Sequence, residues 1–178
     1  TERIESRFLE PACGNGNFLA EVLNRKLNVV ERKYVHTQIE WERYAVFAVC
    51  NIYGVDILED KAEECRQRLF NIFKDRYNSL FADKCKPEVL RSVNFLLHRN
   101  ILWGDALDFT NPETKEPIIF SEWSIVNGNL LKRKDYMFKF LVEKTHQFSF
   151  FNDKGEVNAI DEPVKDFPLV HFLQLSEL

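Results

Sequence analysis

Hydrophobic positions along the first 110 residues follow two alternating patterns. Four stretches carry apolar residues every three or four positions, which is the spacing of an amphipathic helix. These stretches are residues 19–30, 41–49, 62–80 and 89–97. Three short apolar runs stand before, between and after them and are typical of buried strands. The runs are residues 7–10, 52–56 and 100–105.

This alternation predicts the fold class. Helical crossovers between strands return the chain to the same end of a sheet, so consecutive strands pair in parallel. We expect an α/β protein with an open, mostly parallel sheet and helices on both faces. Beyond Asp108 the pattern changes, and the sequence predicts one further strand at residues 123–126, a hairpin at residues 148–160 and an irregular tail.

The composition is that of a globular protein. The chain has 178 residues, of which 45% are hydrophobic and 29% charged, so we expect one globular domain with a hydrophobic core. The longest apolar run, residues 44–50, is too short to cross a membrane. The only methionine is Met137, so nothing serves as an initiator, and we expect a chain truncated at its amino end.

The positions of the cysteines and histidines and the net charge argue against several kinds of site. The four cysteines form no C-x-x-C pair and no histidine has the spacing of a zinc site, which predicts a cytoplasmic protein without a metal. The net charge of −4 argues against binding of nucleic acid through phosphate neutralisation over the whole surface. The histidines accompany no nucleophile motif, so hydrolase chemistry has no support.

Special residues stand at the carboxyl ends of all three predicted parallel strands, where open sheets bind ligands. Glu10 and the glycine-containing segment 14–16 follow the first strand, Asp56 ends the second, and Asp105 ends the third. Glycines let the backbone approach a ligand at a helix start, where N–H groups are exposed. An acid after the second strand suits a ribose diol, and Asp105 suits an adenine amino group. Together these positions predict a nucleoside site.

A nicotinamide dinucleotide is the first competitor for this site, because G-x-G before a helix also belongs to its fingerprint. Leu19 occupies the position of the third glycine, where it would crowd the contact between helix and strand. Glu10 would repel a pyrophosphate. A cofactor with a cationic centre and a nucleoside fits better.

Residues 8–19 read FLEPACGNGNFL and resemble a known motif, D/E-P-A-C-G-S/T-G-x-F-L. It is the S-adenosylmethionine motif of the amino-group DNA methyltransferases of restriction–modification systems. Residues 53–57, YGVDI, resemble the second motif of this family, whose acid holds the ribose hydroxyls. Residues 103–106, WGDA, resemble the third, whose acid meets the adenine of the cofactor. The resemblance covers residues 6–110 and implies a Rossmann-like methyltransferase fold.

The resemblance also implies a cofactor, S-adenosylmethionine, and the residues that bind it. These are Glu10, Cys13, Gly14, Gly16, Phe18, Asp56, Ile57, Asp105 and Ala106. Residues 1–110 would then form the cofactor-binding core, and residues 111–178 a degenerate catalytic-side segment with an irregular tail. The family's F-x-P segment, which precedes the first strand, is not found in this sequence.

The family's catalytic motif, N/D-P-P-Y/F/W, has only a partial counterpart. Its asparagine accepts a hydrogen bond from the target amino group, and its aromatic ring stacks on the flipped base. Asn129 takes the place of the catalytic asparagine in the nearest equivalent, but leucines at 130 and 131 replace both prolines and Lys132 replaces the aromatic residue.

Two functions are consistent with this sequence. The first is transfer of a methyl group to the exocyclic amino group of adenine in DNA. The second is a catalytically inactive cofactor-binding or interaction subunit that acts with a partner, which the incomplete catalytic motif and the acidic charge balance favour. DNA is an expected partner, bound weakly, and the basic run at residues 132–134 is the candidate for phosphate contacts.

Overall fold

The computed structural model describes residues 3–147 and 162–178, and its framework is a parallel sheet of three strands. The strands are β1 (Phe8–Glu10), β2 (Ile52–Asp56) and β3 (Ile101–Trp103). They lie in the order β1-β2-β3, with Phe8 opposite Ile52 and Gly54 opposite Ile101. All five residues of the central strand β2 are buried. The three strands predicted in the first 110 residues are thus confirmed.

Four long helices connect these strands, as the apolar spacing predicts. They are α1 (Asn17–Tyr34) and α2 (Gln38–Cys50) between β1 and β2, and α3 (Glu59–Phe81) and α4 (Pro87–Asn100) between β2 and β3. A single turn of 3₁₀-helix, η1 (Ala82–Lys84), separates α3 from α4. The starts of the last two helices follow from local chemistry, because Glu59 and Asp60 favour the amino end of a helix and Pro87 has the backbone angle of a first helical residue.

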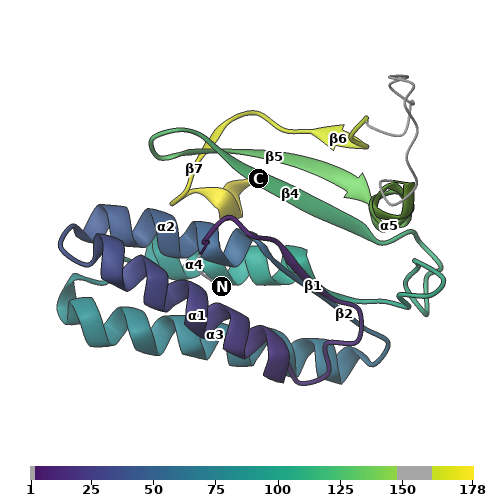
Figure 1. Ribbon diagram of the computed structural model, residues 1–178, viewed down its shortest axis with the longest axis horizontal. Helices are drawn as coiled ribbons and strands as arrows, with labels where there is room; N and C mark the ends of the chain where they lie inside the picture. Colours follow the sequence, from purple (N-terminus) through teal and green to yellow (C-terminus); the bar gives the residue numbers. More distant parts are fainter. Residues whose placement is uncertain (1–2, 148–161) are drawn as a thin grey trace.

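The strand order explains why these helices form one layer. The chain moves across the sheet in one direction, from β1 to β2 to β3, and right-handed crossovers in one direction lie on one face. Figure 1 shows α1 to α4 together in the lower part of the molecule, beneath β4 and β5. Along β2, Ile52 belongs to the core shared with these helices, whereas Tyr53 and Val55 pack on the other side.

The opposite face is covered by an antiparallel sheet and one helix. The hairpin strands β4 (Ile119–Asn127) and β5 (Leu130–Met137) are followed by α5 (Phe138–Gln147). Two short strands, β6 (Lys165–Asp166) and β7 (Val170–His171), pair with β5, and the turn of 3₁₀-helix η3 (Leu175–Glu177) closes the described chain. Phe120 and Phe138 pack against Tyr53 and Val55, which joins the two sheets.

This second layer corrects one part of the sequence prediction. A strand does occupy residues 123–126, but it belongs to β4, which pairs antiparallel with β5 and not with the parallel sheet. Of the helices described, four lie on one face of the parallel sheet, and α5 is on the other. The α/β class is confirmed at this level. The hairpin predicted at residues 148–160 lies outside the described residues.

Within the described residues, no helix is both long enough and apolar enough to span a membrane.

Candidate cofactor-binding site

The loop between β1 and α1 turns sharply at the carboxyl edge of the parallel sheet. Gly14 and Gly16 have φ angles of +52° and +80°, a region that side chains other than glycine rarely adopt. The N–H of Cys13 donates to the carbonyl of Val55 at 2.9 Å, which attaches the loop to β2. Gly16 precedes α1 and no side chain caps this helix, so its first N–H groups remain available at the edge.

Asp56 joins this loop to the end of β2. One oxygen of its carboxylate accepts a hydrogen bond from the N–H of Gly14 at 2.7 Å, and the other accepts one from the N–H of Leu58 at 3.0 Å. The side chain is nearly buried, with 8% exposure. Because each carboxylate oxygen can accept more than one hydrogen bond, Asp56 retains acceptor capacity.

Asp105 is held at the same edge by the loop after β3. Its carboxylate accepts hydrogen bonds from the N–H groups of Leu107 at 2.8 Å and Asp108 at 3.3 Å. The preceding Gly104 donates its N–H to the carbonyl of Asp56 at 2.8 Å. A Cβ at Gly104 would lie 2.4 Å from a methyl carbon of Ile118, so a larger residue here would have to displace that side chain.

The predicted residues Glu10, Cys13 and Ala106 lie around these groups. Glu10, half-buried at the end of β1, accepts a hydrogen bond of 3.4 Å from the N–H of Ala12. Cys13 is buried beneath the loop. Ala106 packs against the small core between β2 and the antiparallel layer.

Exposed apolar side chains surround the acids of this edge. Phe18 and Ile57, both predicted from the sequence, are 50% and 56% exposed. Leu58 and Leu107 are also exposed, Leu107 the most of the four, and the sequence interpretation missed them. The apolar pair that directly follows Asp56 was the available signal.

Trp103 was also missed. Its indole N–H donates to the carbonyl of Ile57 at 3.0 Å, which links the ends of β2 and β3. In outline, the edge consists of backbone N–H groups, two fixed carboxylates and an apolar rim. Such a set can bind a nucleoside that carries a positive charge.

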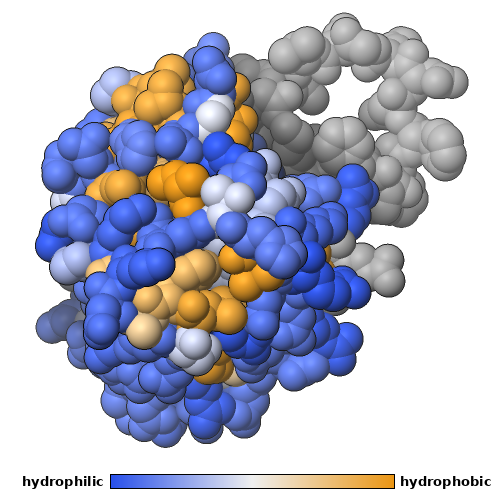
Figure 2. Space-filling view, turned by 90° about the vertical axis from the view of Figure 1, so that its left-hand side faces the viewer, coloured by the Kyte–Doolittle hydropathy of each residue, from blue (hydrophilic) through white to orange (hydrophobic). Residues whose placement is uncertain are grey.

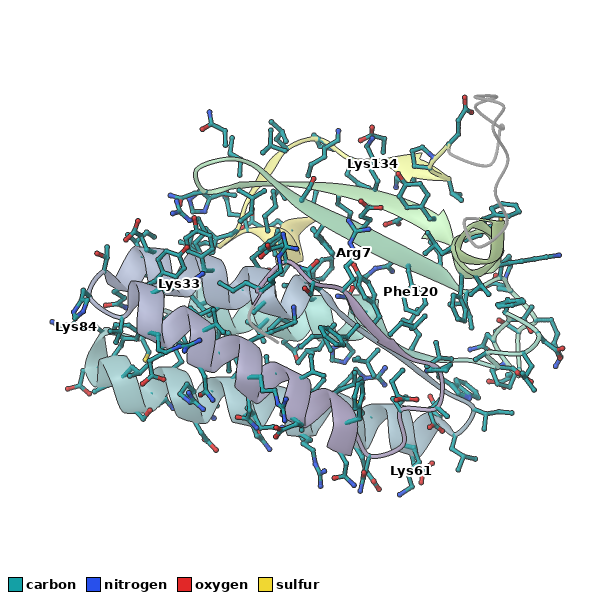
Figure 3. The ribbon with its side chains drawn as sticks, in the orientation of Figure 1. Arg7, Lys33, Lys61, Lys84, Phe120 and Lys134 are labelled. Carbon is teal, nitrogen blue, oxygen red and sulfur yellow. The ribbon has the colours of Figure 1, made fainter. Side chains whose placement is uncertain are left out.

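The structure does not bring Asn129 to this edge. Asn129 stands in the turn between β4 and β5, where its side chain accepts a hydrogen bond of 3.2 Å from Arg43 and its carbonyl accepts one of 3.0 Å from the N–H of Phe172. The turn lies at the left in Figure 1, whereas β1 and β2 end at the right. Figure 3 marks the same right-hand end by Lys61, near the start of α3. The direction of β4 is the reason. This strand runs from the end of the molecule that carries the carboxyl edge to the opposite end, and Asn129 lies in the turn that follows it.

Figure 2 views the end of the molecule that carries this turn, and separate apolar patches interrupt a mostly hydrophilic surface there.

The basic run at residues 132–134 is not the exposed cationic surface expected from the sequence. Arg133 is 4% exposed and forms two hydrogen bonds of 2.8 Å with the carboxylate of Asp135. Its guanidinium lies 4.0 Å from the ring centre of Phe167. Lys132 donates to the carbonyl of Phe167 at 2.6 Å and pairs with Asp166. Two of the three cations are therefore engaged inside the protein.

Among the residues that the structure describes, no group of three or more histidine, cysteine, aspartate or glutamate side chains could hold a metal ion. Comparison of the chain with models of protein families, with curated proteins and with solved structures found no match.

Proposed function

We propose that this chain binds S-adenosylmethionine at the carboxyl edge of its parallel sheet, as the cofactor-binding domain of an amino-group DNA methyltransferase that acts on adenine. The observation that carries the proposal is the hydrogen bond between the carboxylate of Asp56 and the N–H of Gly14. It unites the glycine loop of β1 and the acid of β2 in one site. The resemblance of residues 8–19 to the family motif supports the same assignment.

The residues at the edge fit the parts of this cofactor. Asp56 would accept hydrogen bonds from the ribose hydroxyls, and Asp105 one from the adenine amino group. Phe18 and Ile57 would cover the faces of the adenine with their exposed apolar surface. Glu10 would favour the positive sulfonium through its charge.

The bound cofactor supplies a methyl group on a sulfonium, which is already a good leaving group. The protein therefore has to align donor and acceptor rather than to move protons. The proposal includes a Rossmann-like methyltransferase fold for the parallel layer. It also includes a role in restriction–modification. Because such a protein acts on cellular DNA, the proposal places it in the cytoplasm.

Isothermal titration with S-adenosylmethionine and with its demethylated product tests the proposal. We expect Asp56→Ala to weaken binding by roughly 1 to 3 kcal/mol, because charge-assisted hydrogen bonds are lost. Phe18→Ala should also weaken binding, and its exposed position makes a folding defect a poor explanation. Asp83→Ala, an exposed change in η1, is the matched control and should bind normally. Tight binding of a nicotinamide dinucleotide instead would contradict the proposal.

The second candidate is a cofactor-binding subunit that does not catalyse transfer by itself and acts with a partner. The position of Asn129 favours it, because this residue lies in the hairpin turn and not at the edge with Asp56. A radiolabelled methyl-transfer assay on adenine-containing DNA separates the two candidates. We expect little turnover by the chain alone and no further loss in Asn129→Ala. Robust turnover would favour the enzyme.

A further inference from the structure

Arg68 of α3 meets the amino end of α1 beside the candidate site. Its guanidinium donates a hydrogen bond to the side-chain oxygen of Asn17, the first residue of α1. Three residues earlier in α3, Cys65 packs closely against Gly16, where an added Cβ would lie 2.7 Å from the sulfur. Residues three apart share one face of a helix. The packing of α3 on the glycine loop therefore brings Arg68 to the start of α1.

Arg68 differs from the other two arginines of α3 in its partner. Arg66 pairs with Glu63 and Arg76 pairs with Glu31, each at 2.8 Å. Within the part of the chain that the structure describes, Arg68 forms no ion pair with a carboxylate, and its hydrogen-bond partner is a neutral amide. A guanidinium has five N–H groups, so Arg68 keeps its charge and several donors for an anion.

The sign of this charge is unfavourable for the helix that it meets. The amino end of α1 is the positive end of the helix dipole, and no side chain caps its first N–H groups. A cation at this end is repelled by the dipole, whereas an anion is attracted both by the dipole and by the cation. Arg68 is therefore placed to bind an anion and not to stabilise α1.

Carboxylates occupy the strand ends of the same edge. Glu10 ends β1, Asp56 ends β2, and Asp105 follows β3. These groups accept hydrogen bonds from hydroxyl and amino groups of a nucleoside, but they repel a carboxylate of the same ligand. The start of α1, with Arg68, is the place at this edge where a negative group of the ligand is attracted.

We propose that Arg68 binds the carboxylate of the amino-acid part of S-adenosylmethionine, together with the first N–H groups of α1. This inference rests on the proposed function and extends it, because the residues assigned there contact the nucleoside and the sulfonium. A guanidinium suits this role, since its planar pair of N–H donors matches the two oxygens of a carboxylate. The site should then discriminate between nucleosides that carry a carboxylate and those that do not.

Isothermal titration with two ligands tests this assignment. S-adenosylhomocysteine and 5′-methylthioadenosine share the adenine, the ribose and a neutral sulfur, but only the first has the amino-acid part. We expect Arg68→Ala to weaken binding of S-adenosylhomocysteine by about tenfold and to change binding of 5′-methylthioadenosine by less than about twofold. Arg68→Lys, which keeps the charge, should retain part of the preference. Lys74→Ala removes an exposed charge from the same helix and should bind both ligands as the wild type does.

A purely structural role of Arg68 gives a different result. If its hydrogen bond to Asn17 only joined α1 to α3, Arg68→Ala would weaken both ligands alike and lower the midpoint of urea unfolding, and the inference would be overturned. Unchanged binding of S-adenosylhomocysteine by Arg68→Ala, or equal affinity of the wild type for the two ligands, would also overturn it. Failure of the wild type to bind either ligand would overturn the proposed function itself, and this inference with it.

Discussion

The two layers of this molecule use polar residues in opposite ways. In the parallel layer, Asp56 and Asp105 stand at strand ends, where their carboxylates hold loops by accepting hydrogen bonds from backbone N–H groups. In the antiparallel layer, Arg133 and Asp135 point inward from β5 and pair with each other among aromatic rings. A charged residue thus fixes the loops of the candidate site in one layer and balances a buried charge in the other. The partners of the side chain distinguish the two uses, because Asp56 and Asp135 are about equally buried, at 8% and 6% exposure.

The largest effect should come from breaking the buried pair of the antiparallel layer. Arg133→Met leaves the carboxylate of Asp135 buried without its main partner, and we expect a loss of about 3 to 5 kcal/mol in the free energy of unfolding. Urea denaturation measures it. Replacement of both residues by apolar ones should recover much of the loss. A change below about 1 kcal/mol in the single variant would show that Arg99, 3.6 Å from Asp135, replaces the lost cation.

One glycine with a positive φ in each layer can be replaced by alanine, and the two losses of stability can then be compared. Gly16→Ala meets both an unfavourable backbone angle and the sulfur of Cys65, so we expect a loss of about 2 to 4 kcal/mol in stability. Gly128→Ala, in the turn of the β4–β5 hairpin, has a similar φ of +54° and open space around it. It should lose only about 1 kcal/mol. Thermal or urea unfolding compares them, and equal losses would show that the contact with Cys65 is unimportant.

Lys26 in α1 is a buried charge on the helical side of the parallel sheet, and it can be compared with the buried pair Arg133–Asp135 of the antiparallel layer. Its ammonium donates to the carbonyls of Ile4 and Ser6, both at 2.5 Å, and burial lowers its pKa to about 8. Between pH 8 and 10 the unfolded chain holds this proton while the folded protein has lost it, so the free energy of unfolding should rise with pH. Relative to Lys26→Met, we expect a gain of about 2 kcal/mol over this range. A difference between the two proteins that is independent of pH would contradict the lowered pKa.

The smallest effect concerns DNA and the antiparallel layer. Since Lys132 and Arg133 are engaged inside the protein, only Lys134 of the basic run is expected to contribute to phosphate binding. In Figure 3 it lies on β5. Lys134→Ala should reduce the slope of log affinity against log salt by at most about 1. Adding Lys132→Ala should leave the slope where Lys134→Ala alone puts it. A total reduction of about 2 in the double variant would show that the run opens on DNA.

The parallel layer could be predicted from the sequence better than the antiparallel layer. The helices and parallel strands were predictable because a period of three to four residues and short apolar runs arise from contacts along one element. The strand-end acids Asp56 and Asp105 followed from the same alternation. The pairing of β4 with β5 was not predictable, since an apolar strand carries no mark of its neighbour. For the same reason Asn129 was assigned to a strand end rather than to a hairpin turn.

Contacts between distant segments were also beyond the sequence. Nothing in residues 132–134 shows that Arg133 is inward and stacked on Phe167, because a basic run is usually a solvated surface. The close approach of Gly16 to Cys65 likewise depends on how α3 packs beneath the loop. These features follow from tertiary packing, which no local period records.

The hydrogen bond from Trp103 to the carbonyl of Ile57 places a fluorescent indole at the rim of the candidate site. Of its three tryptophans, Trp41 and Trp123 are completely or almost completely buried in the core, and Trp103 alone stands at the rim of the candidate site. A ligand that settles between Ile57 and the loop after β3 would change the surroundings of a single indole. Its emission would therefore rise, fall or shift against a constant background from the other two, and binding could be followed without any label.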